Sequence, residues 1–528
     1  MDDALPWASA LAVQNGRFIA VGASEAVDTH IGRETEVVDG LGAFVMPGLL
    51  DSHCHAVEAA RADLYEVRLS GTDGLDDVIR SVGDALTRLA GKGWLKGAGW
   101  SIRLIDQMRL PGALAALDQV TADRPMVLRD SSHHAMFANS AALRIADVSA
   151  ADVKGGLVDR RADGSLSGLL FEDACGLIDR AIPLDEDAVR RRSALHAVST
   201  YNSFGVTGFV QAATTEMTMK LFSDLDREGS LSAWVATCIA TDTILTPERE
   251  GIGAETIARR NTYRSHHVVV DFVKFFMDGV PGARTASFLS PYALREGVGA
   301  EPAPFHSAEA LSRLIQPLDA NGIHVKVHAV GDRAIRETLD AIASVRHQNG
   351  GGGPQHSIAH LSYISDADIP RLRELDVAAD LCPPLWFPNA ILQANAVALG
   401  NERADRAWPI GDILRSGATA VLGTDWPIVS SPNPWPGLAA LVTREDPSRC
   451  VSGVFRPDQA LTLQQALRLC TCNVAAYMGI GDRTGSIACG KSADFAFLDR
   501  NLLEVRPQDI ADTRVSKTYF GGRLVYSR

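Results

Sequence analysis

Six residues that can bind a metal ion lie along this chain where strands are expected to end. They are His53, His55, Lys274, His328, His360 and Asp425. The last four close, or nearly close, apolar strand-like runs. The parallel strands of one barrel present their carboxyl ends at one face, so ligands from several strand ends can meet there. The spacing therefore predicts a catalytic metal site.

The first run ends in two imidazoles separated by one residue. Strand side chains alternate between faces, so His53 and His55 are expected to point the same way, with Cys54 pointing opposite. This arrangement places two neutral nitrogen ligands side by side. Two polar residues in a loop after Gly48 are the alternative.

Lys274 lies in the apolar run Val268–Phe276, where a lone ammonium is costly unless it is paired or chemically altered. Carbamylation by carbon dioxide would convert this lysine into a carboxylate able to bridge two metal ions. An ion pair with Asp271 or Asp278 is the alternative. Burial alone leaves both interpretations open.

His328 and His360 end runs that are one β/α step apart, and Asp425 closes the run that begins at Ala420. An aspartate at this place can bind a metal and carry a proton to a leaving group. A helix cap ahead of Trp426 is the alternative for Asp425, and a hydrogen-bonded structural role is the alternative for either histidine taken alone.

The elements expected to position these residues alternate between strand and helix. The candidate helices include 333–345 and 366–375. Eight strands with intervening helices favour a parallel (β/α)8 TIM barrel, with a doubly wound open sheet as the second choice. The candidate strands are Leu49–His55, Val206–Ala212, Trp234–Ala240, Val268–Phe276, His324–Val330, Ser357–Leu361, Val377–Cys382 and Thr419–Asp425.

The two ends of the chain carry short strand patterns, which predict a small β domain. Strands are expected on both sides of Asn15-Gly16, at Glu36–Asp39, and again near the C-terminus. We expect the natural start to lie upstream of Met1, or this domain to lack one strand. The predicted boundaries are 1–47 plus 480–528 for the β domain and 48–479 for the barrel, with an insertion at about 60–195 over the barrel mouth.

Composition limits the class of partner. The formal net charge is −13, and hydrophobic and charged residues make up 46% and 22% of the chain, without a basic run. A small-molecule substrate is therefore expected rather than nucleic acid or a membrane. The eight cysteines show no disulfide framework, and the acidic start is unlike a cleavable signal. These features predict a cytoplasmic protein with reduced thiols, and a homodimer is the working expectation.

Several motifs resemble those of the amidohydrolase superfamily, most closely its branch of N-substituted formamide deformylases. The resemblance covers nearly the whole chain. The matching segments and residues are Pro47–His55, His328–Ala334, Gly423–Pro427, Gly485–Asp494, His134 with Asn139-Ser140, Gly168 with Glu172, Lys274 with Asp278-Gly279, and Arg284–Ala286.

The resemblance implies a distorted TIM barrel, a small β-sandwich built from both termini, and one or two divalent metal ions, with zinc expected first. It assigns His53, His55 and Asp425 to one ion and His328 and His360 to the other, bridged by a carbamate on Lys274. Two departures are Cys54 between the first histidines and Ala359 before His360, where this branch commonly has a glutamate. The second departure removes a carboxylate beyond the ligands and bears on affinity for the second ion.

The expected reaction is hydrolysis of a non-peptide carbon–nitrogen bond, in an amide or N-substituted formamide, by a metal-activated water. Asp425 would move the proton, and His134 would help to polarise the carbonyl. Candidate substrate contacts are Arg284, Arg333, Trp386 and Trp426. Hydrolysis of a cyclic imide, lactam or lactone is the main alternative, and a non-catalytic regulatory barrel is a minor one.

Overall fold

The computed structural model describes residues 5–70, 73–89, 93–130, 135–148, 153, 156–172, 174–241, 251–293 and 302–528. The chain forms two compact units. The first combines Met1–Ala56 with Leu195–Arg528, and the second is Val57–Ala194. The predicted β domain and barrel both fall within the first unit, so the boundary drawn between them stays a prediction.

An eight-stranded sheet of parallel neighbours forms the centre of the first unit and confirms the predicted barrel. Its order is β17-β16-β15-β14-β13-β12-β11-β4. Residues of β11, β12, β15 and β16 are buried throughout, as expected for strands covered on both faces. The bounds are β4 Leu49–Cys54, β11 Val206–Thr214, β12 Trp234–Ala240, β13 Val268–Phe276, β14 His324–Ala329, β15 His356–His360, β16 Val377–Leu381 and β17 Ala420–Leu422.

The barrel nearly closes between its first and last strands, beyond the end of β17. The Asp425 amide donates to the His53 carbonyl at 2.7 Å, and the His55 amide donates to the Trp426 carbonyl at 2.8 Å. A Cβ at Gly423 would lie 2.6 Å from the Cβ of His53, so this close approach requires glycine. The closure brings the first and last predicted ligands together.

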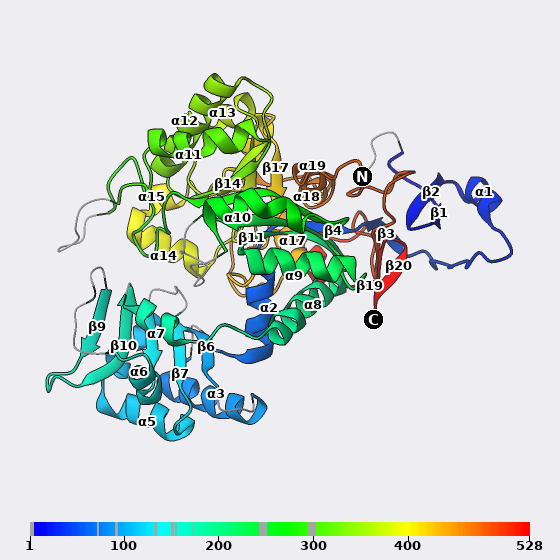
Figure 1. The fold of residues 1–528 in the computed structure, drawn as a ribbon. Helices are drawn as coiled ribbons and strands as arrows, with labels where there is room; N and C mark the ends of the chain where they lie inside the picture. The colour runs from blue at the N-terminus through cyan, green and yellow to red at the C-terminus, as the bar shows by residue number, and fades with distance from the viewer. Residues whose placement is uncertain are drawn as a thin grey trace. The chain divides into compact units, whose positions relative to one another are not determined.

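Helices α9 (Glu216–Arg227), α11 (Ala308–Ala320), α12 (Asp332–Asn349) and α13 (Ile369–Glu374) pack on the strands, as Figure 1 shows. Helix α12 is longer than predicted, and α13 is shorter. Gly331 is the N-cap residue of α12, and the carboxylate of its first residue, Asp332, accepts the Leu289 amide at 2.7 Å.

Two small sheets from the chain ends form the predicted β-sandwich. One pairs β1 (Ala10–Gln14) with β2 (Arg17–Gly22), and the other has the order β20-β19-β18-β3. Phe18, Ala493 and Phe495 form their shared core. The members of the second sheet are β3 Phe44–Pro47, β18 Phe495–Leu498, β19 Val515–Phe520 and β20 Arg523–Ser527.

The strand expected at Glu36–Asp39 was wrong, because this segment is irregular. Val37 and Val38 are 67% and 44% exposed, and no described strand pairs with them. Their alternation with polar neighbours resembles a strand, but a strand also needs a partner that satisfies its backbone and covers one face.

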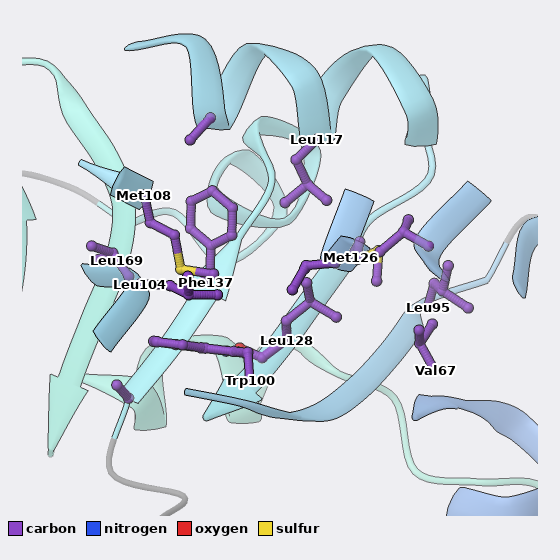
Figure 2. Close-up of a cluster of buried hydrophobic side chains, with 14 of the residues drawn as sticks. Val67, Leu95, Trp100, Leu104, Met108, Leu117, Met126, Leu128, Phe137 and Leu169 are labelled. Atoms are coloured by element: carbon purple, nitrogen blue, oxygen red, sulfur yellow. The ribbon is translucent and has the colours of Figure 1, made fainter. Parts of the chain in front are cut away.

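The second unit has its own sheet and its own core. The sequence predicted an insertion in this region but not a separate sheet. Its six strands follow the order β5-β6-β7-β8-β10-β9. Trp100, Leu128 and Phe137 pack at the centre of a cluster covered by Leu117 of helix α5 (Pro111–Thr121), as Figure 2 shows. The strands are β5 Glu66–Arg68, β6 Leu95–Trp100, β7 Met126–Asp130, β8 Ala135–Ala138, β9 Gly156–Arg160 and β10 Leu166–Glu172.

The placement of this unit over the barrel mouth stays a prediction. Among the helices that the structure describes, none combines the length and apolarity needed to cross a membrane.

Candidate metal centre

Five of the six predicted ligands lie close together at the carboxyl ends of the barrel strands. The Oδ1 atom of Asp425 is 3.7 Å from Nε2 of His53 and 3.5 Å from Nε2 of His55. The Nζ atom of Lys274 is 3.4 Å from Nε2 of His53. The other oxygen of Asp425, Oδ2, is 3.8 Å from Nδ1 of His360. Asp425 therefore faces imidazoles that come from two different strands.

The sixth predicted ligand, His328, packs against the ring of His360. Their ring centroids are 4.4 Å apart. The Nε2 atom of His328 is 3.4 Å from the Gly279 carbonyl and 3.9 Å from a carboxylate oxygen of Asp278. His328 thus lies at the edge of the centre, with one ring nitrogen turned toward the loop after β13.

The donor atoms fit a metal ion. His53, His55 and Asp425 offer ligand atoms that all lie within 4.8 Å of one another. Ligands of one tetrahedral zinc ion, with bonds of about 2.0–2.3 Å, lie roughly 3.3–3.8 Å apart. The separations of 3.7 Å from His53 and 3.5 Å from His55 to Asp425 fall in this range. Imidazole and carboxylate are ligands that zinc, iron, cobalt and manganese all accept.

Burial keeps the imidazoles in the neutral form that binds metals. It lowers the pKa of His55 and of His328 to about 3, and nearby Lys274 adds to the effect at both. The pKa values of His53 and His360 are also well below the ordinary value, again mainly because the rings are buried. An ion can therefore bind without first displacing a proton from these rings.

Burial acts on Lys274 and Asp425 in opposite directions. It lowers the pKa of Lys274, and the neighbouring ammonium of Lys326 lowers it further. It raises the pKa of the Asp425 carboxyl, against the attraction of Lys274. Both shifts favour the neutral forms, an amine and a carboxylic acid.

Neither carboxylate suggested as a partner of Lys274 is paired with it. Asp271 accepts bonds from the guanidinium groups of Arg260 and Arg264. Asp278 accepts backbone amides of Ser287, Val330 and Gly331 at 2.9, 3.0 and 2.9 Å. Burial nevertheless raises the pKa of Asp278 to about 7. Within the described residues, the ion-pair alternative for Lys274 therefore finds no support.

Asp380, at the end of β16, holds the tautomer of His53 and was missed from the sequence. Its Oδ2 atom lies 2.9 Å from Nδ1 of His53, so that nitrogen donates to the carboxylate and leaves Nε2 free. The Ser52 hydroxyl donates to Oδ1 of Asp380 at 2.5 Å. The Lys326 ammonium also donates to Asp380 and, at 3.0 Å, to the Ser52 carbonyl.

Burial alone would lower the pKa of Lys326, and the adjacent Asp380 carboxylate raises it above the ordinary value. The sequence signal for this pair was an acid and a base, each inside an apolar strand run. It could not show that the two lie on strands separated by β15 alone, close enough to form an ion pair.

Asp51 ties β4 to the turn after β17. It accepts the Thr424 hydroxyl at 2.6 Å, the Tyr201 hydroxyl at 2.9 Å and the His53 amide at 2.9 Å. Burial raises its pKa to about 6, although each of these bonds lowers it. The carboxyl fixes the backbone on which His53 and Asp425 stand.

The remaining predicted residues are His134 and the candidate substrate contacts Arg284, Arg333, Trp386 and Trp426. His134 is among the residues that the structure does not describe. Arg333 bonds to Glu337 of its own helix, and Arg284 donates to the Ala293 carbonyl at 3.2 Å. The indoles of Trp386 and Trp426 are fully buried, as expected for large aromatic side chains that pack in the core. Substrate contact by these residues stays a prediction.

Comparison with known proteins shows sequence similarity along nearly the whole chain. The model of a group described as the amidohydrolase family matches residues 36–526. Protein LONG AFTER FAR-RED 3 from Arabidopsis thaliana is 29% identical over 99% of this chain and 89% of its own length. The N-substituted formamide deformylase of Arthrobacter pascens is 27% identical over 99% of this chain and 95% of its own length.

A solved structure shares the fold. It is an uncharacterized metal-dependent hydrolase from Pyrococcus horikoshii, which superimposes with a TM-score of 0.76 and covers 94% of each chain. Its sequence is 23% identical to this chain.

Proposed function

We infer the function of this chain from one premise: the chain belongs to the amidohydrolase family. We propose that it is a metal-dependent hydrolase that cleaves a non-peptide carbon–nitrogen bond in an amide or N-substituted formamide. The observation that carries the proposal is the buried group of His53, His55 and Asp425 at the strand ends. The similarity to a formamide deformylase along nearly the whole chain supports the choice of bond.

The proposed ligands divide between two positions. His53, His55 and Asp425 hold one divalent ion, zinc being the first expectation, and His360 with His328 would hold a second. A bound ion supplies Lewis-acid chemistry to the carbonyl and to the attacking water. Asp380 keeps Nδ1 of His53 protonated and Nε2 directed into the centre.

Asp425 is the proposed carrier of the proton. Its carboxylate takes a proton from water as the new carbon–oxygen bond forms, and returns it to the nitrogen as the carbon–nitrogen bond breaks. Burial raises the pKa of this carboxyl, which favours a group that holds the proton between the two steps. Delivery to nitrogen lets the amine leave as a neutral molecule.

Lys274 is proposed to carry a carbamate. Its Nζ lies 3.4 Å from Nε2 of His53, and no described carboxylate forms an ion pair with it. Burial favours the neutral amine, which is the form that attacks carbon dioxide. The carbamate would place an anionic oxygen ligand between the two ion positions.

The same ligands would serve hydrolysis of a cyclic imide, lactam or lactone, since these differ only in the group that leaves. The relative's activity toward N-substituted formamides favours the open-chain substrate.

Replacing Asp425 by Asn tests the proton role. Asp425 has a φ of 55°, a conformation that asparagine also tolerates, so the backbone should be preserved. We expect kcat/KM for an N-substituted formamide to fall at least about 10³-fold, within the range of general acid–base catalysis, while most of the metal stays bound. Turnover and metal content are measured on the same preparation.

The matched control is Asp376→Asn. Asp376 is an exposed aspartate with a φ of 50° that directly precedes the amino end of β16, and its replacement should leave turnover unchanged. Full activity of Asp425→Asn would end the assignment of Asp425. Absence of turnover by the metal-loaded wild type on amides and formamides would end the choice of bond.

A further inference from the structure

A cysteine also lies within the group of candidate ligands. Cys382 directly follows β16, and its side chain is fully buried. Its Sγ, one nitrogen of His53 and one nitrogen of His360 all lie within 4.8 Å of one another. In the part of the chain that the structure describes, this trio and the trio of His53, His55 and Asp425 are the groups that could hold an ion.

The backbone of Cys382 helps to orient the neighbouring imidazole. Nδ1 of His360 donates to the Cys382 carbonyl at 3.1 Å, which leaves Nε2 of His360 available to an ion. The thiol lies 3.5 Å from the same Nδ1 and 3.7 Å from the Asp380 carbonyl. Both thiol contacts are long and weak, so little would be lost if the thiol proton left.

His53 connects the two trios through one atom. Its Nδ1 is held by Asp380, so both trios must use Nε2. One lone pair binds one ion. The thiol of Cys382 and the carboxylate of Asp425 therefore compete for, or share, the ion that His53 binds.

We propose that Cys382 is a thiolate ligand of the ion bound by His53, so that the centre selects zinc or another thiophilic divalent metal over manganese or magnesium. The inference rests on the metal site of the proposed function and adds a sulfur ligand to it. On binding, the thiol proton passes to solvent and the sulfur–metal bond forms, without oxidation or reduction. A thiolate ligand favours soft metals, whereas carboxylate and imidazole alone discriminate poorly.

Burial, together with the carboxylates of Asp380 and Asp425, raises the pKa of the Cys382 thiol well above its ordinary value. The sulfur is therefore expected to remain a thiol in the metal-free protein and to become a thiolate only when an ion binds.

Zinc K-edge X-ray absorption on the full-length, zinc-loaded protein tests the proposal without using activity. The expected spectrum contains one sulfur neighbour at about 2.3 Å beside nitrogen or oxygen neighbours at about 2.0–2.1 Å. Cys382→Ala should remove the sulfur neighbour and raise the zinc Kd more than about 100-fold, beyond the loss typical of residues outside the ligand set.

Cys238→Ala is the matched control. Cys238 is a fully buried thiol on β12 that belongs to neither trio, so its replacement should leave the sulfur neighbour and the zinc Kd unchanged. If Cys382→Ala does not fold, the wild-type spectrum and the cobalt-loaded wild type still decide. A thiolate ligand adds a sulfur-to-cobalt charge-transfer band in the near ultraviolet, which Cys238→Ala should retain.

A wild-type spectrum with only nitrogen and oxygen neighbours would overturn the proposal, as would a sulfur neighbour that persists in Cys382→Ala. The outcome is separate from that of the proposed function. A sulfur-free zinc site that hydrolyses formamides would remove only the ligand assignment. A sulfur-bound zinc in a protein inactive on all amides would remove only the reaction.

Discussion

Neutral nitrogen ligands at this site are a consequence of where the histidines are buried. A solvent-exposed imidazole is partly protonated near neutrality, whereas burial lowers the pKa values of His53, His55, His328 and His360. The tautomer is then decided by a partner for each ring. Asp380 holds His53 by Nδ1, and the Cys382 carbonyl holds His360 by Nδ1, so Nε2 is the nitrogen of each ring that remains free to bind an ion.

Two buried lysines on neighbouring strands differ because only one of them has a carboxylate. Lys274 and Lys326 are register partners on β13 and β14. Lys326 bonds to Asp380, so it stays an ammonium, whereas burial beside that positive charge favours an amine at Lys274. Lys326 is thus suited to a structural ion pair, and Lys274 is suited to reaction with carbon dioxide.

Labelled bicarbonate tests the carbamate. Wild type incubated with ¹³C-bicarbonate and zinc should show a carbamate carbonyl signal by ¹³C NMR, since the amine is buried beside the metal ligands. Lys274→Gln should lose this signal and at least about 10²-fold of kcat/KM, as expected when a ligand that supports the catalytic ion is removed. Lys220→Gln, at an exposed ion pair with Asp224, is the control and should keep both. A carbamate signal that survives in Lys274→Gln contradicts the assignment.

At the scale of the elements, the site depends on how the barrel closes. The turn after β17 reaches β4 through the Asp425 amide and through Asp51, which accepts the Thr424 hydroxyl. Gly423 permits that approach, because any side chain there would collide with His53. Candidate ligands that are far apart in sequence therefore become neighbours through backbone bonds.

Helix α9 is tied to the start of β13 by Asp226. Its carboxylate accepts the Ser265 hydroxyl at 2.5 Å, the His267 amide at 2.8 Å and Nδ1 of His267 at 2.6 Å. Burial would raise the pKa of Asp226, but these bonds outweigh it and lower the pKa to about 2. The link holds the strand that carries Lys274 against its covering helix.

Asp226→Asn should reveal this link as a pH-dependent loss of stability. The folded pKa of Asp226 lies below the unfolded value of 3.8, so the stabilisation is complete above that pH and is lost as pH falls through 3.8 toward 2. The variant should be less stable than wild type by about 2 kcal/mol at pH 6, and the difference should shrink below pH 4. Urea unfolding at several pH values measures it.

Asp366→Asn is the control for that series. Asp366 is 82% exposed in its ion pair with Arg406, so its replacement should change stability by no more than about 0.5 kcal/mol. A difference for Asp226→Asn that stays constant from pH 6 to pH 3 would show that the carboxylate charge is not what stabilises the link.

At the scale of the whole molecule, the candidate metal ligands all belong to one of the two units. Every candidate metal ligand lies in the unit made of Met1–Ala56 and Leu195–Arg528. Val57–Ala194 has its own sheet and its own apolar clusters, including Trp100 and Phe137. Each unit therefore has the buried core that a separate stability requires.

Metal removal should affect the two units differently. Free zinc at 100 times its Kd stabilises the state that binds it by about 2.7 kcal/mol. Amides of β4, β13 and β15 that exchange through opening of the first unit should therefore exchange about 100-fold more slowly with zinc than with chelator. Amides of Val57–Ala194 should not change. Hydrogen exchange with mass spectrometry measures both, and equal protection of the two units would contradict the separation.

The barrel and the convergence of the candidate ligands could be predicted from sequence because both depend on short apolar runs. These runs locate the strands, and β12 and β13 begin and end where predicted. His53, Lys274, His360 and Asp425 stand at or near the ends of such runs, and the carboxyl ends of parallel strands share one face. Their convergence therefore needs only the barrel topology.

The tertiary structure decided what surrounds those ligands. Asp380, Lys326 and Cys382 act through partners on other strands, and nothing in their local sequence identifies those partners. The sheet of the second unit and the irregular segment at Glu36–Asp39 were also beyond the sequence, because strand formation depends on a partner strand as well as on alternation. Local periodicity determines which residues face inward, whereas pairing across the barrel determines what each of them touches.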